Sequence, residues 1–431
     1  MFPRNTRKWL PGALLVLAST TSWAQIAAPS SSSQSPVAPA PLALKEAFDA
    51  AWARQPEAQS LAARRDAATA QRDAAGSWIA EPMALELSTE GDQLNDNEGS
   101  REHMVGLSVP LWLPGERSRM GAVADAEAQV TASRVSAAQL RTAAEVREAY
   151  WGWQRARVEL ALADERRDKA RQLAADVARR VRSGELAQAD QHQADGAAAL
   201  AEIEQAAAAS ALARAAQQLW ALTGVRPAST SATATAAPGG EPLPGTADDP
   251  SALEAAHPAL TALRDQAAVA RSSAELAQVQ TRANPELTLS TTRERSQSGE
   301  PYDQTIALGV RIPFGSGSRN RAKQATAEAE AIEADVQLRL ERERVLAELD
   351  AARLRLEAAG RQAKAAEQRA RLAEESRGFF DKSFRLGETD LPTRLRIELE
   401  ATDARRQAAL ARLEQAAATS ALRQALGLLP E

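Results

Sequence analysis

Two stretches of the chain alternate apolar residues with small or polar ones, which is the period-two pattern of a β-strand. Residues 103–111 place valine or leucine at every second position from Val105 on, and residues 304–312 do the same with isoleucine, leucine and valine. A shorter strand-like segment precedes each of them, at 83–90 and 286–292, across a polar loop rich in turn-forming residues. The sequence therefore predicts two β-hairpins, each with one apolar face.

The rest of the chain has the apolar spacing of long helices. We expect these helices at residues 42–79, 116–182, 186–222, 250–282, 319–385 and 389–426. A helix over 116–182 would be about 100 Å long at a rise of 1.5 Å per residue. Two shorter helices placed end to end match that length, so we expect each long helix to run antiparallel to two shorter ones. A heptad series in the first long helix predicts a packing seam made of Val123, Val130, Ala137, Ala144, Trp151 and Val158.

The chain is duplicated at an offset of 203 residues. At that offset six pairs of glycines or prolines coincide, more than this composition gives by chance: Pro82 with Pro285, Gly106 with Gly309, Pro110 with Pro313, Gly184 with Gly387, Gly224 with Gly427, and Pro227 with Pro430. The motif Arg-x-Gly-Glu occurs in both halves, at 182–185 and 385–388. We therefore expect two repeats, residues 42–224 and 250–431, joined by a linker or equatorial segment at 225–249.

The N-terminal residues have the pattern of an export signal. Residues 1–24 begin with three basic residues, continue with an apolar run and end on Ser22-Trp23-Ala24, which suits a signal peptidase. A short membrane anchor is the alternative, although the apolar run is well below the about 20 residues of a spanning helix. Residues 25–41 are rich in serine, proline and alanine, and we expect a flexible linker there.

Composition narrows the function classes. Of the 431 residues, 44% are hydrophobic but only 4% are aromatic, and alanine dominates the apolar count, which is typical of closely packed long helices. There is no cysteine, so the chain offers no disulfide, no thiolate metal ligand and no cysteine for a lipid anchor. A net charge of −5 argues against a nucleic-acid partner.

The residue types that carry catalysis or metal binding form no motif in this sequence. The three histidines, His103, His192 and His257, are scattered and lack the spacing of metal ligands. The sequence also lacks a glycine-rich phosphate loop, a nucleophile elbow and a paired catalytic motif. We therefore expect no enzymatic activity, no cofactor and no metal site.

The apolar faces of the predicted strands must be buried against another apolar surface. A soluble sheet packed on helices would show the same alternation, but hairpins at the end of helices about 100 Å long have no core beside them. Strands of about eight or nine residues approach the length that crosses a bilayer in a tilted barrel, whereas four strands are fewer than the roughly eight of the smallest barrels. The sequence therefore favours several copies that share one barrel in lipid. The alternative is a periplasmic coiled-coil structural or adaptor protein.

Three motifs in this duplicated order, "SVPLWLPGERSR", "VRSGELAQAD" and "SFRLGETDL", resemble the outer-membrane efflux family typified by TolC. The chain looks most like the CzcC-like branch of that family, which exports heavy-metal cations. The resemblance implies a mainly α fold with a small β part, in which the order helix, strand, strand, long helix, helix occurs twice. It also implies a homotrimer whose twelve-stranded β-barrel lies in the outer membrane and continues into the periplasm as an α-helical barrel. Many relatives carry an N-terminal lipidated cysteine, which this chain lacks.

The same resemblance implies a passive exit conduit from the periplasm to the exterior. Its partners would be a periplasmic membrane-fusion adaptor, an inner-membrane pump of the RND type, and the lipid of the outer membrane. The exported solutes would be metal cations or drugs, and the sequence does not choose between them.

The resemblance also marks three groups of residues. The turns that end the two long helices would dock on the adaptor through Arg182, Gly184, Glu185, Arg385, Gly387 and Glu388, although a helical hairpin turn alone accounts for the glycines. Just beyond these turns, Asp190 and Asp390 would line the channel entrance, or would lie on solvated helix faces. At the junctions of strand and helix, Trp112 and Phe314 would lie at the membrane interface, or would only pack the junction.

Overall fold

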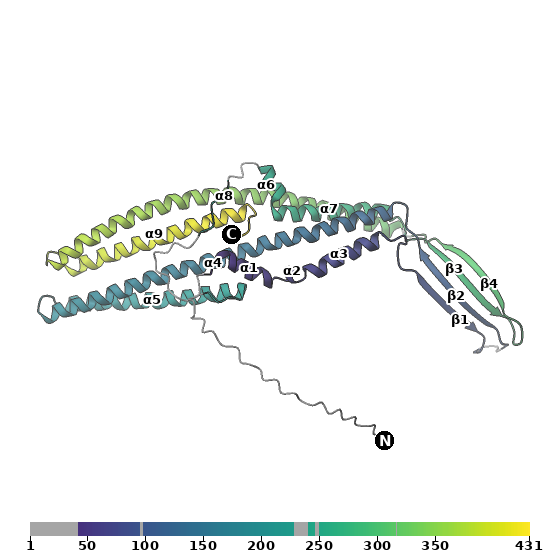
Figure 1. Cartoon of the computed structure of the whole chain (residues 1–431), viewed down its shortest axis with the longest axis horizontal. Coiled ribbons are helices and arrows are strands. Elements are labelled where there is room, and N and C mark those ends of the chain that lie inside the picture. The colour runs from purple at the N-terminus through teal and green to yellow at the C-terminus, as the bar shows by residue number, and fades with distance from the viewer. Residues whose placement is uncertain (1–41, 95–97, 228–239, 246–249, 316) are drawn as a thin grey trace, which may run out of the picture. The chain divides into compact units, whose positions relative to one another are not determined.

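The computed structural model describes residues 42–94, 98–227, 240–245, 250–315 and 317–431. The chain divides into the units Met1–Ala40 and Pro41–Glu431, and all described residues belong to the second. The expected signal peptide, the expected linker before residue 42 and most of the expected segment between the repeats lie outside the described residues. The described chain consists of helices and one four-stranded sheet (Figure 1), so the expected mainly α fold with a small β part is confirmed.

The same order of elements occurs twice along the chain. The first set is α1 (Leu44–Arg54), α2 (Pro56–Gln59), α3 (Leu61–Ala75), β1 (Ala84–Gly91), β2 (Arg101–Pro110), α4 (Glu116–Arg182) and α5 (Gln188–Thr223). The second set is α6 (Pro250–Ala256), α7 (Pro258–Val279), β3 (Glu286–Arg295), β4 (Asp303–Arg311), α8 (Gly317–Arg385) and α9 (Leu391–Ala425). The four longest helices begin and end within two residues of their expected bounds.

The single helices expected at 42–79 and 250–282 are wrong, because each is interrupted before a proline. The residues that precede the two prolines, Gln55 and His257, have extended backbone angles (φ −69°, ψ 140° and φ −68°, ψ 120°). A proline ring clashes with a helical conformation of the residue before it, and it supplies no N–H to the helix. The prolines therefore separate α1 from α2 and α6 from α7, and a further break without a proline, at Ser60, separates α2 from α3.

The two hairpins join into one antiparallel sheet with the strand order β1-β2-β3-β4. The central strands β2 and β3 pair along their whole length, from Arg101 opposite Arg295 to Pro110 opposite Glu286. This pairing connects the two repeats. It also leaves β1 and β4 at the edges of the sheet, where each has one row of backbone groups available to another strand.

The long helices pack beside shorter ones, as their lengths predict. α4 contacts α5, α7, α3 and α1, while α8 contacts α9 and α7. The predicted seam of α4 is buried at Val123, Val130, Ala137 and Trp151, and half-buried at Ala144 and Val158. The largest core cluster surrounds the fully buried Trp153 and joins α4 to α1, α5 and α9. In the described part of the chain, no helix combines the length and the hydropathy needed to cross a lipid bilayer.

Candidate functional site

One face of the sheet is apolar and exposed. The register places Leu85, Leu107, Leu289 and Leu308 in one row across the four strands, with exposed fractions between 38% and 73%. The neighbouring rows continue this face with Leu87, Val105, Thr291 and Ile306, and with Val109, Leu287 and Val310. We call this surface the apolar face. An apolar patch this continuous is unusual on a soluble monomer and marks a contact with a partner or a membrane.

The opposite face of the sheet, which we call the polar face, consists mainly of small and polar residues. Its rows are Ala84, Ser108, Thr288 and Gly309, then Glu86, Gly106, Ser290 and Ala307, then Ser88, Met104, Thr292 and Thr305. The row nearest the loops is entirely acidic and contains Glu90, Glu102, Glu294 and Asp303. A sheet with these two faces suits a wall between an apolar phase and water.

The junction between the sheet and the helices is organised by Glu116, the first residue of α4. Its buried carboxylate accepts hydrogen bonds from the backbone N–H of Leu113 (3.0 Å) and from the side-chain amides of Gln280 (2.8 Å) and Asn284 (3.0 Å). Two of these donors belong to the segment that joins α7 to β3, so Glu116 fastens the two repeats together beside the sheet. Sequence reasoning missed this role, because an acidic residue in the first turn of a helix is common for its favourable interaction with the helix dipole and gives no sign of a contact with the other repeat.

The two predicted interface aromatics lie at this junction in different surroundings. Trp112 is half-buried, and its Nε1–H donates to the backbone oxygen of Ser77 (3.0 Å). Phe314 is 86% exposed. The glycines that follow, Gly115 and Gly315, have φ angles of 82° and 86°, a conformation in which other residues are strained. The first repeat therefore presents an anchored aromatic at this level, and the second presents a free one.

The turns that end α4 and α8 are built in the same way. Gly184 and Gly387 have φ angles of 83° and 80°, and the N–H groups of Glu185 and Glu388 donate to carbonyls five residues earlier, at 2.9 and 3.0 Å. This is the Schellman ending, in which a left-handed glycine closes a helix. All six predicted tip residues are exposed: Arg182, Gly184, Glu185, Arg385, Gly387 and Glu388.

The two turns are joined through Phe384, whose ring is buried. It lies between the guanidinium groups of Arg180 from α4 and Arg394 from α9, at 5.0 and 4.6 Å from the ring centre. Arg394 also pairs with Asp381 (2.7 Å), and the same carboxylate pairs with the exposed Arg385 (2.5 Å). The tip of the α4–α5 hairpin and the tip of the α8–α9 hairpin are therefore in contact with each other, and Arg385 is held in place at the second tip.

The two predicted entrance residues begin the return helices. Asp190 accepts a hydrogen bond from the N–H of Ala187 (3.0 Å), and Asp390 accepts one from the N–H of Thr393 (3.1 Å). The side-chain and backbone hydrogen bonds from Thr393 hold the pKa of Asp390 below its ordinary value. Both carboxylates therefore cap a helix. A role in lining an entrance depends on neighbouring copies of the chain.

A buried ion cluster joins the segment between the repeats to α4 and α9. Glu241, whose side chain is 1% exposed, accepts hydrogen bonds from Nε and Nη2 of Arg147 at 3.0 and 2.6 Å. Arg423 lies 3.2 Å from the same carboxylate, and Ser420 donates to it. Sequence reasoning missed the cluster, because Glu241 is isolated among glycine and proline residues while Arg147 and Ser420 are 94 and 179 residues away along the chain.

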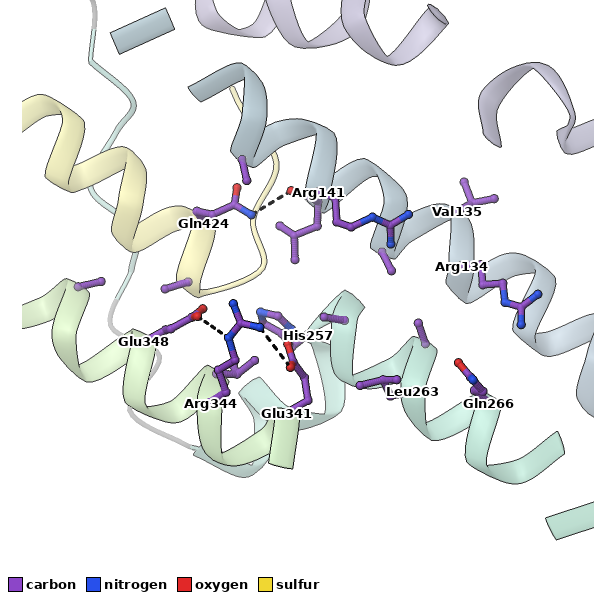
Figure 2. Close-up of a pocket in the computed structure, with 18 of the residues that line it drawn as sticks. Arg134, Val135, Arg141, His257, Leu263, Gln266, Glu341, Arg344, Glu348 and Gln424 are labelled. Carbon is purple, nitrogen blue, oxygen red and sulfur yellow. Dashed lines mark hydrogen bonds and ion pairs between the residues drawn. The ribbon is translucent and has the colours of Figure 1, made fainter. Parts of the chain in front are cut away.

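A pocket of about 1000 Å³ lies between α4, α7, α8 and α9. In Figure 2, Arg344 lies between Glu341 and Glu348, and it pairs with them at 3.8 and 2.8 Å. His257 lies beside them (Figure 2); burial lowers its pKa, and the charge of Glu348 opposes that shift. The carboxylates are neutralised by arginine, which suits a gap between packed helices better than a catalytic centre.

The histidines do not form a metal site in the described chain. His103 lies in β2, His192 in α5, and His257 between α6 and α7. Within the ranges that the structure describes, no three histidine, aspartate or glutamate side chains converge as ligands for a metal ion.

The sequence as a whole matches a known family twice. A family model described as "Outer membrane efflux protein" matches residues 47–225 and 250–428. The chain belongs to this family. The two matches coincide with the two sets of elements in the fold, and the family resemblance that the motifs indicate is confirmed. Proteins of the outer membrane efflux family are transport components, and this member is accordingly not an enzyme.

Several solved structures share the fold of this outer membrane efflux protein at low sequence identity. The outer membrane protein VceC from Vibrio cholerae is 18% identical with a TM-score of 0.71, over 90% of this chain and 97% of that chain. CusC is 17% identical with a TM-score of 0.74, over 89% and 92%. The outer membrane channel CmeC from Campylobacter jejuni is 13% identical with a TM-score of 0.72, over 89% and 85%. No curated protein sequence matches the chain.

Proposed function

We propose that this outer membrane efflux protein is the passive exit conduit of a tripartite efflux system, with its sheet in the outer membrane and its helices in the periplasm. The observation that carries the proposal is the sheet with one exposed apolar face and one small, polar face. In a membrane barrel the first faces lipid and the second faces water. Four strands are too few to close a barrel, so a homotrimer would supply twelve strands, with β1 of one copy beside β4 of the next.

The proposed trimer can be tested with cysteine pairs, because the natural chain contains no cysteine. Ser88→Cys in β1 is combined in turn with Asp303→Cys, Thr305→Cys or Ala307→Cys in β4. Within one copy β1 and β4 are separated by two strands, about 14 Å, which is too far for a disulfide. A disulfide must therefore join two copies.

We expect at least one pair to give covalent dimers and trimers under oxidising conditions, and no species larger than a trimer. The matched controls are the single-cysteine variants, which lack the second thiol of the pair. Monomer alone in all three pairs, or a ladder that continues past the trimer, would contradict a closed ring of three copies.

The partners we propose are a periplasmic membrane-fusion adaptor and, through it, an inner-membrane pump of the RND type that supplies the energy. The matching geometry of the two tips supports this, since three copies with two tips each offer six similar docking surfaces. The docking residues would be Arg182, Gly184, Glu185, Arg385, Gly387 and Glu388. Charge reversal at both tips, Glu185→Lys with Glu388→Lys, is expected to abolish cross-linking to the adaptor while the trimer persists. Undiminished cross-linking would contradict the assignment.

Two further roles belong to the same proposal. Asp190 and Asp390, both near the tips, would line the periplasmic entrance and favour cations there. Trp112 and Phe314 would lie at the inner interface of the membrane, where aromatic side chains are common. Asp190→Asn with Asp390→Asn is expected to reduce the cation preference of single trimers in planar bilayers. An unchanged reversal potential in a salt gradient would exclude the entrance role.

The location follows from the proposed conduit. Residues 1–24 would direct export, after which the trimer would insert in the outer membrane without a lipid anchor on cysteine. Extraction from outer membranes only with detergent, as a heat-resistant trimer, is the expected behaviour. Release as a monomer by osmotic shock would instead identify a periplasmic coiled-coil structural or adaptor protein.

The solutes we propose are metal cations or drugs, and the resemblance of the motifs to the CzcC-like branch supports metal cations. A strain that lacks the protein, with and without a plasmid copy, is compared on a panel of metal salts and drugs. Increased sensitivity to metal cations alone would support the heavy-metal branch. Increased sensitivity to drugs alone would contradict it and leave the conduit in place.

A further inference from the structure

The side of the sheet that carries the apolar face becomes basic toward the loops. In the two rows that follow Val105, His103 lies opposite Arg293 and Arg101 lies opposite Arg295. His103 and Arg101 lie two and four positions from Val105, and Arg293 and Arg295 lie two and four positions from Thr291. Successive side chains of a strand point to opposite faces, so these four side chains lie on the same side of the sheet as the apolar face. We call these four residues the basic band.

The basic band brings like charges together. Arg293 and Arg295 both lie over the ring of Tyr302, at 4.7 and 5.1 Å, and Arg295 donates to the backbone oxygen of Gly99 (3.1 Å). None of the three arginines of the band forms an ion pair with a carboxylate among the residues that the structure describes. Like charges directly opposite each other destabilise an antiparallel pair. A negatively charged partner from outside the described chain would remove that penalty.

The acidic row of the sheet cannot supply this negative charge, because it lies on the polar face. Glu102 and Glu294 occupy the positions between the residues of the basic band, so their side chains point to the other side of the sheet. Charge is thus separated by face at the loop end of the sheet. The basic charges accompany the apolar face, and the acidic charges accompany the polar one.

Distance along the strand places the basic band at the edge of a hydrocarbon layer. From Leu111, at the helix end of the sheet, to His103 there are eight steps, about 26 Å at 3.3 Å per residue. A strand tilt of 35–45° shortens this to about 20 Å along the membrane normal, close to the apolar band of about 25 Å in outer-membrane barrels. The band therefore lies where acyl chains meet headgroups, and arginine stems reach outward from such a position.

We propose that the basic band binds the phosphate groups of anionic lipids in the outer leaflet of the membrane. The inference rests on the proposed function, since it needs the apolar face in the outer membrane with the loops outward. A planar guanidinium binds phosphate with two parallel hydrogen bonds. Tyr302 keeps two of these groups together, and a tyrosine is itself suited to a membrane interface.

The test measures lipid binding to the purified trimer in detergent. The probes are labelled lipopolysaccharide, whose lipid anchor carries phosphates, and the same lipid after enzymatic removal of those phosphates. The variant is Arg293→Gln with Arg295→Gln. The matched control is Arg311→Gln, which removes an exposed arginine from the polar face of the same sheet.

We expect wild type and R311Q to bind the phosphorylated lipid equally well, and R293Q/R295Q to bind it about 25-fold more weakly. An arginine near an anionic lipid surface contributes about five-fold in affinity, and two arginines multiply that effect. The dephosphorylated lipid is expected to bind weakly to all three proteins. Raising the salt concentration is expected to weaken the binding of wild type to the phosphorylated lipid and to leave its binding to the dephosphorylated lipid unchanged.

Equal binding of the phosphorylated lipid by wild type and R293Q/R295Q would overturn the inference, as would equal binding of the two lipids by wild type. If the glutamine variant does not assemble, wild type is compared with the variant Arg293→Lys plus Arg295→Lys, which keeps the charge and loses the planar guanidinium. Weaker binding of the phosphorylated lipid by the lysine variant is then expected, and equal binding of it by the two proteins would overturn the inference. A failure of the proposed function gives a different result from a failure of this inference. The wild-type chain would then form no heat-resistant trimer in outer membranes, whatever lipid it binds.

Discussion

Replacing Glu241 with glutamine tests how the middle of the chain is held together. The carboxylate of Glu241 is shared by Arg147 and Arg423, whose side chains are only 5% and 4% exposed. Glutamine keeps the shape of the side chain but leaves both buried guanidinium groups without their shared anion. Arg423 keeps its ion pair with Glu431 (2.8 Å) and its hydrogen bond to the backbone oxygen of Pro242 (3.2 Å). Arg147 keeps only neutral acceptors, the side-chain oxygen of Gln424 (2.6 Å) and the backbone oxygen of Leu428 (3.0 Å). Breaking a buried ion pair by removing one partner costs about 3–5 kcal/mol, and we expect E241Q to destabilise the chain by that amount.

The ion pair of Arg271 and Asp335 provides a matched control. It uses the same two nitrogens of the arginine: Nε and Nη2 of Arg271 lie 3.1 and 2.6 Å from Oδ1 of Asp335, and the pair joins α7 to α8. Its side chains are 52% and 47% exposed, so water and salt screen the interaction. Asp335→Asn removes the same charge as E241Q but is expected to have a much smaller effect.

The assay is thermal unfolding of the purified protein by circular dichroism at one fixed heating rate, since the apparent midpoint of a protein that unfolds irreversibly depends on that rate. We expect E241Q to lower the midpoint clearly and D335N to lower it much less. Adding Arg147→Met to E241Q removes one of the two stranded charges, so the double variant is expected to be more stable than E241Q alone. Equal midpoints for E241Q and D335N would refute the reasoning from burial, and a double variant less stable than E241Q would refute the reasoning from charge.

Three further substitutions test other features of the chain. Gly427→Ala places a Cβ 2.7 Å from a proline ring at φ 75°, whereas Gly387→Ala meets open space at φ 80°, so the first is expected to lower the thermal midpoint more; equal shifts would contradict this. Burial lowers the pKa of His257, so at pH values between that pKa and about 6.5 the unfolded chain binds a proton that the folded chain does not, and stability falls as the pH falls. His257→Gln is expected to reduce the drop in thermal midpoint between about pH 7.5 and pH 5.5, and an unchanged drop would exclude the histidine as its source. Glu116→Ala leaves three donors without their acceptor, at a cost of about 1–3 kcal/mol for each buried one, and is expected to speed proteolysis at the junction of helix and sheet; unchanged cleavage would count against its fastening role.

Most of the fold could be predicted from the sequence because its signals are local. The bounds of α4 follow from the Pro114-Gly115 turn before it and Gly184 after it, which are helix start and stop signals within a few residues of the ends. The breaks before Pro56 and Pro258 also had a local signal in the prolines themselves. The helical periodicity of the residues on both sides of each proline predicts one continuous helix. The break occurs because a proline disfavours the helical backbone conformation of the residue before it, and this local effect outweighs the periodicity.

The candidate site was predictable only where its residues are neighbours in sequence. The tips could be located because Arg-x-Gly-Glu places arginine, glycine and glutamate in one turn. The basic band could not, because Arg101 and Arg293 belong to different repeats, and only the register of β2 against β3 brings their rows together. The acidic row required the registers of all four strands, and the cluster around Glu241 required contacts between the inter-repeat segment and two distant helices.

The duplication is kept at the tips and broken in the middle of the chain. At the offset of 203 residues, the counterparts of Arg147 and Arg423 are Asp350 and Trp220, and both of these are exposed, so a second copy of the buried ion cluster cannot form. The two tips, in contrast, share the left-handed glycine and the same closing hydrogen bond. A trimer of this chain would therefore present six similar tips but only three ion clusters. The tips of such a trimer would match a partner with sixfold symmetry, whereas the middle of the trimer would have only threefold symmetry. The two repeats can therefore differ in the middle of the chain without disturbing the contact between the tips and that partner.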